Sequence, residues 1–386
     1  MRIGIDARPL QSQRRGVGQY LFYLLKHLAR IDRDNQYVLF YNYFWSLDGF
    51  SPFTCDNPNF SDKVFRFPTH LLDLFWKNFS FPKVDSLMGD VDVFHESLLH
   101  TVPPCRGSVV VTLYDFVPMH YPEYYSRSYL EKYQHSLRQV ANRAAHVIAI
   151  SESTKRDVVS FTSIPAERVS VVYPGVDPQF RPLSKEARLD EVLRAKHLDE
   201  SYILYVGAAN RHKNLGTLLA AYRALAPELR RDYLLAFAGN VSWDYELLLN
   251  EARRLDLSDR VRCIGYVSDE DLPFIYSGAS LVVFPSLYEG FGFVPLEAMA
   301  CGTPAISSNT SSMPEVVGDA GILFDPNDTV ALTHAMNAAL TDQALRATLV
   351  GKGLHRAPTF SWERTARQTL DVYRSVASAR GRGALG

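Results

Sequence analysis

The sequence predicts an α/β protein with two Rossmann-like domains, each built on a doubly wound parallel sheet. Its length of 386 residues suits two domains of ordinary size better than one. In both halves, short runs rich in Val, Ile and Leu alternate with amphipathic segments. Strands separated by helices imply parallel sheets with right-handed crossovers. Regular structure breaks at 173–178, a Pro- and Gly-containing stretch where we place the boundary between the domains.

The composition excludes several classes of protein. Hydrophobic residues make up 47% and charged residues 22% of the chain, which is typical of a globular protein with large cores. A net charge of -1 gives no electrostatic reason to expect nucleic acid as a partner. The four cysteines lie far apart without a CxxC pair, which indicates buried thiols in a reducing compartment. Without a secretory signal or an apolar run of ~20 residues, we expect a cytoplasmic protein.

The first half begins with a strand, a glycine-containing loop and a helix. Apolar residues predict a strand at 3–5, and an amphipathic pattern predicts a helix to about Ala29 that opens after Gly16 and Gly18. This arrangement can accept a phosphate, because the helix start offers free amides. The loop lacks the third glycine of a dinucleotide-binding fingerprint, which argues against a nicotinamide cofactor. Further strands are predicted at 37–41, 91–94, 109–113, 147–150 and 169–172.

The region from 44 to about 82 is aromatic and is predicted to be irregular, with one candidate helix at 70–77. In that helix Leu71, Leu74 and Phe75 would share a face. Two interpretations stay open for this face. It can pack into the core, or it can form a surface that meets a membrane or a lipid acceptor.

Polar residues follow several predicted strands of the first half. His95, Tyr114 and Asp115 come after such strands, and residues just past strand carboxyl ends line the cleft of a doubly wound sheet. Each is a candidate contact for an acceptor or a sugar, or alternatively a turn cap or a buried hydrogen-bonded group. Ser151 is a further candidate and also a good helix start. Asp90-Val91-Asp92 has the spacing of a metal-binding pair, but it opens a core strand, so we interpret it as structural.

The second half places two cations after a strand. The strand predicted at 202–206 leads through Gly207 to Arg211 and Lys213, which can bind phosphate or belong to a solvated loop. Further strands are predicted at 234–238, 261–264, 281–284, 305–307 and 321–324, and a final helix at 362–376.

The stretch 288–302 is the strongest candidate site. After a predicted strand it contains a glycine-rich turn and a helix that Pro295 can open and Gly302 can close. Glu289 and Glu297 bracket the helix start eight positions apart, so a helix would aim both roughly the same way. A strand–turn–helix also occurs in every α/β protein, so geometry alone leaves ligand binding open. The amides that would point out of the helix start and suit a phosphate belong to Gly290, Phe291, Gly292 and Phe293.

The amino-acid sequence of this stretch resembles that of one protein family. The motif consists of two glutamates separated by seven residues. Gly-Phe-Gly follows the first Glu, and Glu-Ala-Met-Ala-Cys-Gly-Thr-Pro begins at the second. This motif is similar to the signature of retaining glycosyltransferases of family 4 (glycosyl transferases group 1). The resemblance implies the GT-B fold, in which two Rossmann-like domains face a cleft. It implies an acceptor-side domain at 1–176, a nucleotide-sugar domain at 177–361 and a helix at 362–378 that crosses back. Arg-Pro-Leu, Gly-Val-Gly-Gln-Tyr and His-Lys-Asn are similar to mannosyltransferases of bacterial polysaccharide biosynthesis.

The resemblance also implies roles for single residues. Asp115 would orient the acceptor or accept its proton, in a segment that usually reads His-Asp in the family. Tyr114 replaces that His here, and a phenol with a pKa of ~10 is a poor base at neutral pH. Glu297 would bind the ribose hydroxyls, and Glu289 would lie by the donor sugar. The remaining implied donor contacts are Gly16 and Gly18 across the cleft, Arg211 and Lys213 at the phosphates, Tyr266 and Val267 beside the base, and the loop of Ser311, Ser312 and Glu315.

These roles predict a metal-independent hexosyltransferase that needs no cofactor. Cations and helix-start amides can stabilise a departing nucleoside diphosphate without a metal. The favoured donor is GDP-mannose, and the acceptor is a saccharide or a lipid-linked saccharide, which adds peripheral contact with the inner face of a membrane as a further expectation. The alternatives are a UDP-sugar-dependent enzyme of the same fold, a sugar-nucleotide epimerase or phosphorylase, and a silent saccharide-binding subunit.

Overall fold

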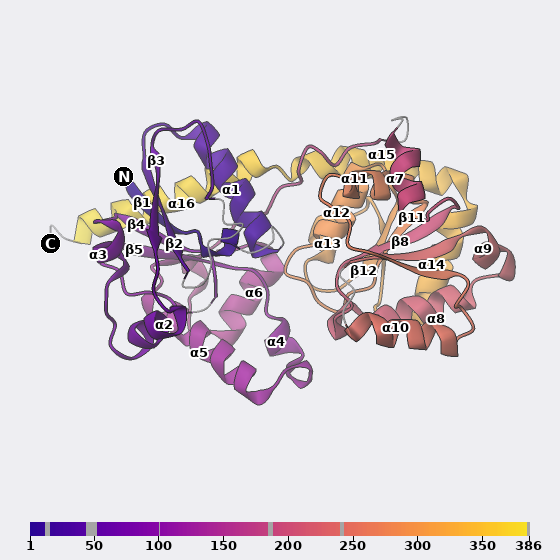
Figure 1. The fold of residues 1–386 in the computed structure, drawn as a ribbon, viewed down its shortest axis with the longest axis horizontal. Coiled ribbons are helices and arrows are strands. Elements are labelled where there is room, and N and C mark those ends of the chain that lie inside the picture. Colours follow the sequence, from indigo (N-terminus) through magenta and orange to yellow (C-terminus); the bar gives the residue numbers. More distant parts are fainter. Residues whose placement is uncertain (12–15, 44–51, 100, 184–187, 240–242, 384–386) are drawn as a thin grey trace. The chain divides into compact units, whose positions relative to one another are not determined.

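The computed structural model describes residues 1–11, 16–43, 52–99, 101–183, 188–239 and 243–383. The chain folds into two compact units. Unit 1 comprises Met1–Gly175 and Ser361–Gly386, and unit 2 comprises Val176–Phe360. Figure 1 shows a sheet flanked by helices in each of them.

The described residues of unit 1 form a parallel sheet of seven strands in the order β3-β2-β1-β4-β5-β6-β7. The strand order reverses between β1 and β4, which makes the carboxyl ends of these two strands the topological switch point. The strands are β1 (Arg2–Asp6), β2 (Gln36–Asn42), β3 (Phe60–Phe65), β4 (Val93–Glu96), β5 (Ser108–Leu113), β6 (His146–Ala149) and β7 (Val169–Val171). The helices are α1 (Val17–Ile31), α2 (Thr69–Asn78), α3 (Val84–Met88), α4 (Val117–His120), α5 (Arg127–Arg143), α6 (Glu152–Phe161) and α16 (Trp362–Gly383), with short 3-10 turns η1 (Arg8–Gln11), η2 (Pro122–Tyr124) and η3 (Ala166–Arg168).

Unit 2 contains a second parallel sheet, of six strands in its described part, in the order β10-β9-β8-β11-β12-β13. Its switch point lies between β8 and β11. The strands are β8 (Tyr202–Val206), β9 (Leu234–Ala238), β10 (Val261–Gly265), β11 (Leu281–Phe284), β12 (Ala305–Ser308) and β13 (Ile322–Phe324). The helices are α7 (Arg188–Ala195), α8 (Leu215–Ala224), α9 (Pro227–Asp232), α10 (Trp243–Arg254), α11 (Leu272–Gly278), α12 (Phe293–Ala300), α13 (Met313–Val317), α14 (Thr329–Thr341) and α15 (Gln343–Arg356), with 3-10 turns η4 (Arg211–Lys213) and η5 (Ala357–Thr359). The two doubly wound parallel sheets confirm the predicted fold class.

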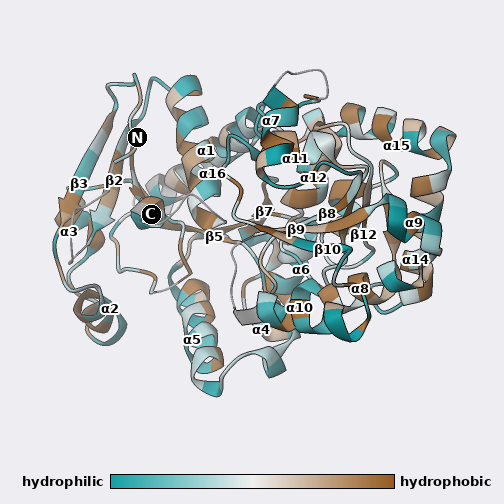
Figure 2. Cartoon of the chain, turned by 45° about the vertical axis from the view of Figure 1, so that its right-hand side comes forward, coloured by the Kyte–Doolittle hydropathy of each residue, from teal (hydrophilic) through white to brown (hydrophobic). Residues whose placement is uncertain are grey.

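The cores follow from the hydrophobic runs of the sequence. The central strands are brown in Figure 2 because apolar residues fill them, as expected for parallel strands covered on both faces. Several helices begin at a residue whose side chain accepts a hydrogen bond from an amide of the first turn, which satisfies a donor that the helix itself leaves free. These caps are Ser126 for α5, Ser151 for α6, Asp328 for α14 and Asp342 for α15.

The last helix, α16, belongs to unit 1 and packs beside α1 (Figure 1). Its first residue, Trp362, stacks on Tyr23 with ring centroids 5.3 Å apart. Thr365 donates a hydrogen bond to the carbonyl oxygen of Tyr173 at 2.7 Å. A Cβ at Gly175 would lie 2.1 Å from the backbone nitrogen of Trp362, so only glycine allows the two segments to approach this closely.

The region before residue 82 differs from the irregular structure that the sequence predicts. It contains the edge strand β3, whose side chains are mostly exposed and therefore lack the apolar alternation that marks a half-buried strand. The helix predicted at 70–77 is present as α2, but its buried side chains are Leu72 and Trp76. The interpretation that Leu71, Leu74 and Phe75 pack into the core is wrong, because all three are exposed. Part of the aromatic region, 44–51, lies outside the described residues.

Candidate functional site

The centre of the candidate site is an ion pair at the switch point of unit 2. Lys213 follows β8 and Glu289 follows β11, and the Lys213 Nζ lies 2.5 Å from the Glu289 Oε1. Both side chains are mostly buried, with exposed fractions of 16% and 17%. The Lys213 ammonium also lies 5.5 Å from the centre of the Phe284 ring at the end of β11. The two strand ends therefore bring together a cation and a carboxylate that are 76 positions apart in the sequence.

The loop that carries Glu289 is held by hydroxyl groups of the loop after β12. The Glu289 N–H donates to the Ser311 Oγ at 2.9 Å, and the Ser312 hydroxyl donates to the Glu289 carbonyl at 2.9 Å. The Thr310 hydroxyl donates to the carbonyl of Leu287 at 2.8 Å. These bonds fix the backbone on both sides of Glu289, so Ser311 and Ser312 position the site through backbone contacts.

The turn that carries Lys213 is fixed by two neighbours that the sequence analysis did not single out. Asn214 has a left-handed backbone (φ 57°) and donates from its side chain to the carbonyls of Pro285 and Pro326. The Leu287 N–H donates to the His212 carbonyl at 2.8 Å. Burial lowers the pKa of His212 to about 4, with a further contribution from Lys213, so its ring is neutral near pH 7. The polar His-Lys-Asn run after a strand was the available signal for this anchor.

Helix α12 begins at the glycine-rich turn. Gly292 is the residue before the helix, with a φ of 149° that favours glycine. The helix starts at Phe293, two residues earlier than the predicted opening at Pro295. Gly290, Phe291 and Gly292 are buried, whereas Phe293 is half-buried. The positive end of an eight-residue helix thus lies a few residues from Glu289, in a place that suits an anionic group.

Glu297 lies on the buried part of α12. It is only 7% exposed, and its Oε2 accepts a hydrogen bond from the Tyr276 hydroxyl at 2.8 Å. Burial raises the pKa of Glu297 to about 8; the Tyr276 hydrogen bond opposes this rise, and the charges of Asp269 and Asp177 add to it. A carboxyl group with its pKa near neutrality is unusual outside functional sites, although structural networks also produce such shifts.

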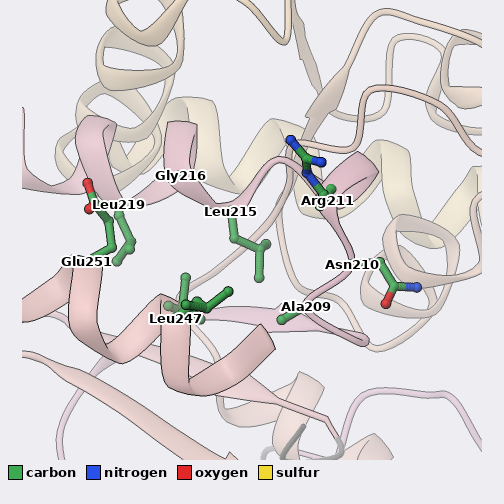
Figure 3. Close-up of a pocket in the computed structure, with 9 residues that line it drawn as sticks. Ala209, Asn210, Arg211, Leu215, Gly216, Leu219, Leu247 and Glu251 are labelled. Carbon is green, nitrogen blue, oxygen red and sulfur yellow. The ribbon is translucent and has the colours of Figure 1, made fainter. Parts of the chain in front are cut away.

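The other predicted donor contacts of unit 2 are distributed around these groups. Tyr266 and Val267 follow β10; the Tyr266 side chain is exposed, and Val267 is buried. Arg211 is exposed at the start of η4. A pocket of about 220 Å³ lies between α8 and α10. Figure 3 shows Arg211 at one end of it and leucines along its length. Neither Lys213 nor Glu289 lines it, and it is smaller than the ~300–1,000 Å³ of typical ligand pockets.

In unit 1, Asp115 lies just beyond β5, and it is exposed. Its Oδ1 accepts a hydrogen bond from the Val117 N–H at 3.2 Å, and its carbonyl accepts one from the Tyr133 hydroxyl at 2.7 Å. The rings of Tyr125, Tyr129 and Tyr133 stack in a row, with successive centroids 5.0 and 6.4 Å apart. Burial, and then the negative charge of Asp115, raise the pKa of Tyr125 to about 12. A carboxylate beside a row of phenols can hold a polyhydroxylated ligand.

Three of the candidate acceptor contacts in unit 1 are corrected by their burial. His95 lies within β4, and its Nδ1 and Nε2 contact the hydroxyls of Tyr373 (2.6 Å) and Thr112 (2.7 Å), which leaves neither ring nitrogen for a sugar. The Tyr114 hydroxyl is buried, the Tyr114 ring packs edge to face with the Tyr20 ring, and burial raises the pKa of Tyr114 well above 10. Ser151 is fully buried as the cap of α6. Gly16 and Gly18 do open α1 as predicted, with Gly16 exposed at a φ of 52°.

Comparison with known proteins identifies the family. The model described as Glycosyl transferases group 1 matches residues 190–355, and the model described as Glycosyltransferase Family 4 matches residues 14–180. The O-antigen chain mannosyltransferase B of Escherichia coli is 34% identical over 265 residues, which cover 69% of this chain and 70% of that protein. The chain belongs to glycosyltransferase family 4. The family that the motif at 289–297 predicts is therefore confirmed.

Two further similarities place this family 4 glycosyltransferase. The serotype-specific mannosyltransferase WbdA of Escherichia coli is 33% identical over 269 residues, covering 68% of this chain but only a third of WbdA. The structure of sucrose-phosphate synthase from Thermosynechococcus elongatus superposes with a TM-score of 0.76 at 24% identity, covering 98% of this chain and 99% of that one. The fold is thus GT-B, and the relatives by sequence include mannosyltransferases of O-antigen synthesis.

The glycosyltransferase also has a buried charged cluster that the sequence analysis missed, at the switch point of unit 1. Arg8 donates two side-chain hydrogen bonds to Asp6 at 2.8 Å, and its guanidinium lies 3.8 Å from Glu96. Although burial opposes it, Arg8 holds the pKa of Asp6 below its usual range, whereas burial and the Asp6 charge raise the pKa of Glu96 well above its own. An Asp-x-Arg sequence directly after a strand was the signal that could have revealed this cluster.

In the part of the glycosyltransferase that the structure describes, no group of three or more His, Cys, Asp or Glu side chains could hold a metal ion. Asp92 accepts a hydrogen bond from the Arg2 N–H at 2.8 Å, and Asp90 pairs with Arg106 at 3.4 Å. Both residues therefore take part in contacts near the amino-terminal ends of the central strands β1, β4 and β5, in keeping with the structural interpretation of Asp90-Val91-Asp92.

Proposed function

We propose that this glycosyltransferase moves mannose from GDP-mannose to a saccharide or lipid-linked saccharide, with retention of anomeric configuration and without a metal ion. The observation that carries the proposal is the contact between Lys213 and Glu289 at the switch point of unit 2, beside the start of α12. Mannose is favoured because the two relatives by sequence described above are mannosyltransferases. The donor, the stereochemistry and the residue roles are our inferences from this geometry and from the similarity to those mannosyltransferases.

In the reaction that we propose, the acceptor hydroxyl oxygen bonds to the anomeric carbon as the bond from that carbon to the diphosphate oxygen breaks. Negative charge develops on the leaving diphosphate, and Lys213, Arg211 and the first amides of α12 would stabilise it. Glu289 would stabilise the positive charge that develops on the sugar ring. Glu297 would accept hydrogen bonds from the ribose hydroxyls, Tyr266 and Val267 would contact the base, and attack and departure would occur on the same face of the sugar.

On the acceptor side we propose a role for Asp115. Its exposed carboxylate beside the row of tyrosines supports binding of a saccharide hydroxyl, from which Asp115 or the leaving phosphate oxygen would take the proton. We leave His95, Tyr114 and Ser151 out of the acceptor site because they are turned into the core. The contact of Gly16 and Gly18 with the diphosphate stays a prediction.

Asp115→Asn is expected to lower kcat by roughly 10- to 100-fold, because the amide keeps the shape of the side chain but cannot take a proton. Initial rates at saturating donor with varied acceptor check this. The control is Glu123→Gln, which removes a carboxylate from an exposed residue of the neighbouring turn. Unchanged kcat and acceptor KM in Asp115→Asn would remove Asp115 from the mechanism.

The proposed function is tested by incubating the enzyme with GDP-mannose, UDP-glucose, ADP-glucose and dTDP-glucose, each with and without a mannose-terminated acceptor. We expect transfer from GDP-mannose at a rate at least tenfold above the others, unchanged by a chelator, with the α-configuration of the donor retained in the NMR spectrum of the product. Transfer from a UDP-sugar would favour the alternative donor. Conversion of the donor in the absence of an acceptor would indicate an epimerase. If calorimetry shows no binding of any nucleotide, the protein is a silent saccharide-binding subunit.

We place the reaction in the cytoplasm, at the inner face of the membrane. The four cysteines are free thiols, which supports a reducing compartment. A lipid-linked acceptor would bring the enzyme to a bilayer surface. Within the described ranges, no helix is both long enough and apolar enough to cross a membrane.

A further inference from the structure

Unit 1 exposes a concentration of large hydrophobic side chains around α2. Of the thirteen such side chains exposed in the described residues, six fall between Phe67 and Phe81. Isolated exposed apolar residues are normal in proteins, but a contiguous group marks a surface that meets another apolar phase. We call this group the α2 apolar face; it consists of Phe67, Leu71, Leu74, Phe75, Phe79 and Phe81.

Helix α2 is apolar on two sides, and only one of them serves the core. Leu72 and Trp76, one turn apart, are buried against a cluster that includes Phe40 and Phe94. Leu71, Leu74 and Phe75 have the spacing of neighbours on a different part of the helix surface. In Figure 2, brown residues alternate with teal ones along α2. Packing against the sheet therefore leaves the second apolar side of α2 unused.

The loop after α2 extends this surface. Phe79 and Phe81 have the largest exposed fractions among the exposed hydrophobic side chains of the described residues, 67% and 65%. Phe79 contacts Phe75 with ring centroids 5.6 Å apart, so the loop continues the surface of the helix. The Trp76 Nε1 donates a hydrogen bond to the Pro82 carbonyl at 2.8 Å, which holds the end of the loop against the helix. The face is thus part of the folded unit.

The charge around the α2 apolar face identifies what would cover it. Between Phe60 and Val84 there are four basic residues, all exposed, and two acidic ones. One of the acidic residues, Asp73, is half-buried, and its charge acts on buried Arg8. The four basic residues are Lys63, Arg66, Lys77 and Lys83. Large apolar side chains bordered by exposed cations are the features of helices that lie in the interface of an anionic bilayer.

We propose that the α2 apolar face docks unit 1 onto an anionic lipid bilayer. Leu71, Leu74, Phe75 and the two loop phenylalanines enter the boundary between head groups and acyl chains, while Lys77 and Lys83 meet the lipid phosphates. The proposal adds a lipid partner to the proposed function. It rests on exposed side chains of unit 1, so lipid binding and sugar transfer can be tested separately.

The test is co-flotation of the full chain with vesicles of phosphatidylglycerol and phosphatidylcholine, compared with vesicles of phosphatidylcholine alone. We expect binding to the anionic vesicles that weakens with salt. Leu71→Gln/Leu74→Gln/Phe75→Gln should bind at least tenfold more weakly. Lys77→Glu/Lys83→Glu should lose most of the preference for anionic lipid. The matched control, Leu247→Gln/Val330→Gln, removes exposed apolar side chains from unit 2 and should bind within twofold of the wild type.

Circular dichroism and Tm show whether the triple variant still folds. If it does not, Phe67→Gln/Phe79→Gln replaces it, because these residues flank the helix and their loss leaves α2 intact. Equal vesicle binding by wild type and a folded variant would overturn the proposal. A second outcome would also overturn it. If light scattering shows a dimer for the wild type and a monomer for the variant, and neither protein binds vesicles, the face joins two copies of the chain. Vesicle binding without sugar transfer would keep this inference and remove the proposed function.

Discussion

Replacing Lys213 by Ala should lower kcat/KM by roughly 100- to 1,000-fold. In our proposal this ammonium stabilises the negative charge on the departing diphosphate, and a mostly buried cation (16% exposed) is less screened by water than the exposed Arg211 that would assist it. Initial rates with GDP-mannose and a mannose-terminated acceptor check the prediction. The control Arg223→Ala removes an exposed cation from α8, and it should stay within twofold of the wild type.

Loss of Lys213 also leaves the Glu289 carboxylate without its 2.5 Å partner, so part of the effect will be structural. The double variant Lys213→Met/Glu289→Gln separates the two contributions, because it removes both charges and restores a neutral packed pair. Its Tm should return toward the wild-type value while the activity stays low. Recovery of activity together with Tm would mean that the pair serves the fold and not the reaction, and it would remove the observation on which the proposed function rests.

The sequence was informative about unit 2 because the site there is local. Glu289, the glycine turn and Glu297 lie within nine residues, so the start of a helix after a strand already fixed their relative placement. The contact between Lys213 and Glu289 could not be predicted in this way. It depends on β8 pairing with β11, and the order of strands in a sheet is decided by long-range packing that a single sequence does not reveal.

In unit 1, small errors in the predicted ends of strands produced wrong site candidates. The predicted strand stops at Phe94, but β4 runs from Val93 to Glu96, so His95 lies inside the strand. Successive side chains of a strand point to opposite faces, and an error of one or two residues at its end moves a candidate from the cleft into the core. Tyr114 was misplaced for a related reason, since it follows β5 directly while its hydroxyl is buried and its ring packs against that of Tyr20.

Helix α2 shows a limit of periodicity. Its sequence contains two apolar sets, Leu72 with Trp76 and Leu71 with Leu74 and Phe75, and either can be read as the buried face. The structure buries the first set against an apolar cluster that includes Phe40 and Phe94, and the Arg8 guanidinium lies 5.6 Å from the Trp76 ring centre. Arg8 is held by Asp6 at the end of β1, far from α2 in sequence. Because these partners are distant from α2 in the sequence, the pattern within the helix does not reveal which side stays exposed.

Glu297 is predicted to make donor binding dependent on pH. Its pKa of about 8 means that most molecules of the free enzyme carry the neutral acid at pH 7. Ribose hydroxyls are held best by an ionised carboxylate, which only accepts hydrogen bonds. We therefore expect the donor Kd to fall about tenfold between pH 6.5 and pH 8.5. Calorimetric titration with GDP across this range measures it, and Glu297→Gln should bind more weakly with a flat profile.

A matched variant tests whether the ionisation belongs to Glu297. The Tyr276 hydroxyl donates to Glu297 and opposes the rise in its pKa, so Tyr276→Phe should move the midpoint of donor binding to higher pH. A midpoint that does not move in Tyr276→Phe, or a profile that persists in Glu297→Gln, would assign the titration to another group.

The same group should affect stability with a definite sign. The pKa of Glu297 is higher in the folded protein than the usual 4.5 of an unfolded chain, so its contribution to stability is fully present below pH ~4.5 and is lost as pH rises through about 8. The whole loss is on the order of 5 kcal/mol by the relation between pKa and free energy. Glu297→Gln carries no such charge. The Tm of this variant minus the Tm of the wild type should therefore be larger at pH 9 than at pH 6. A carboxyl that weakens the fold when it ionises, and strengthens donor binding in that same state, is what a residue retained for function would show.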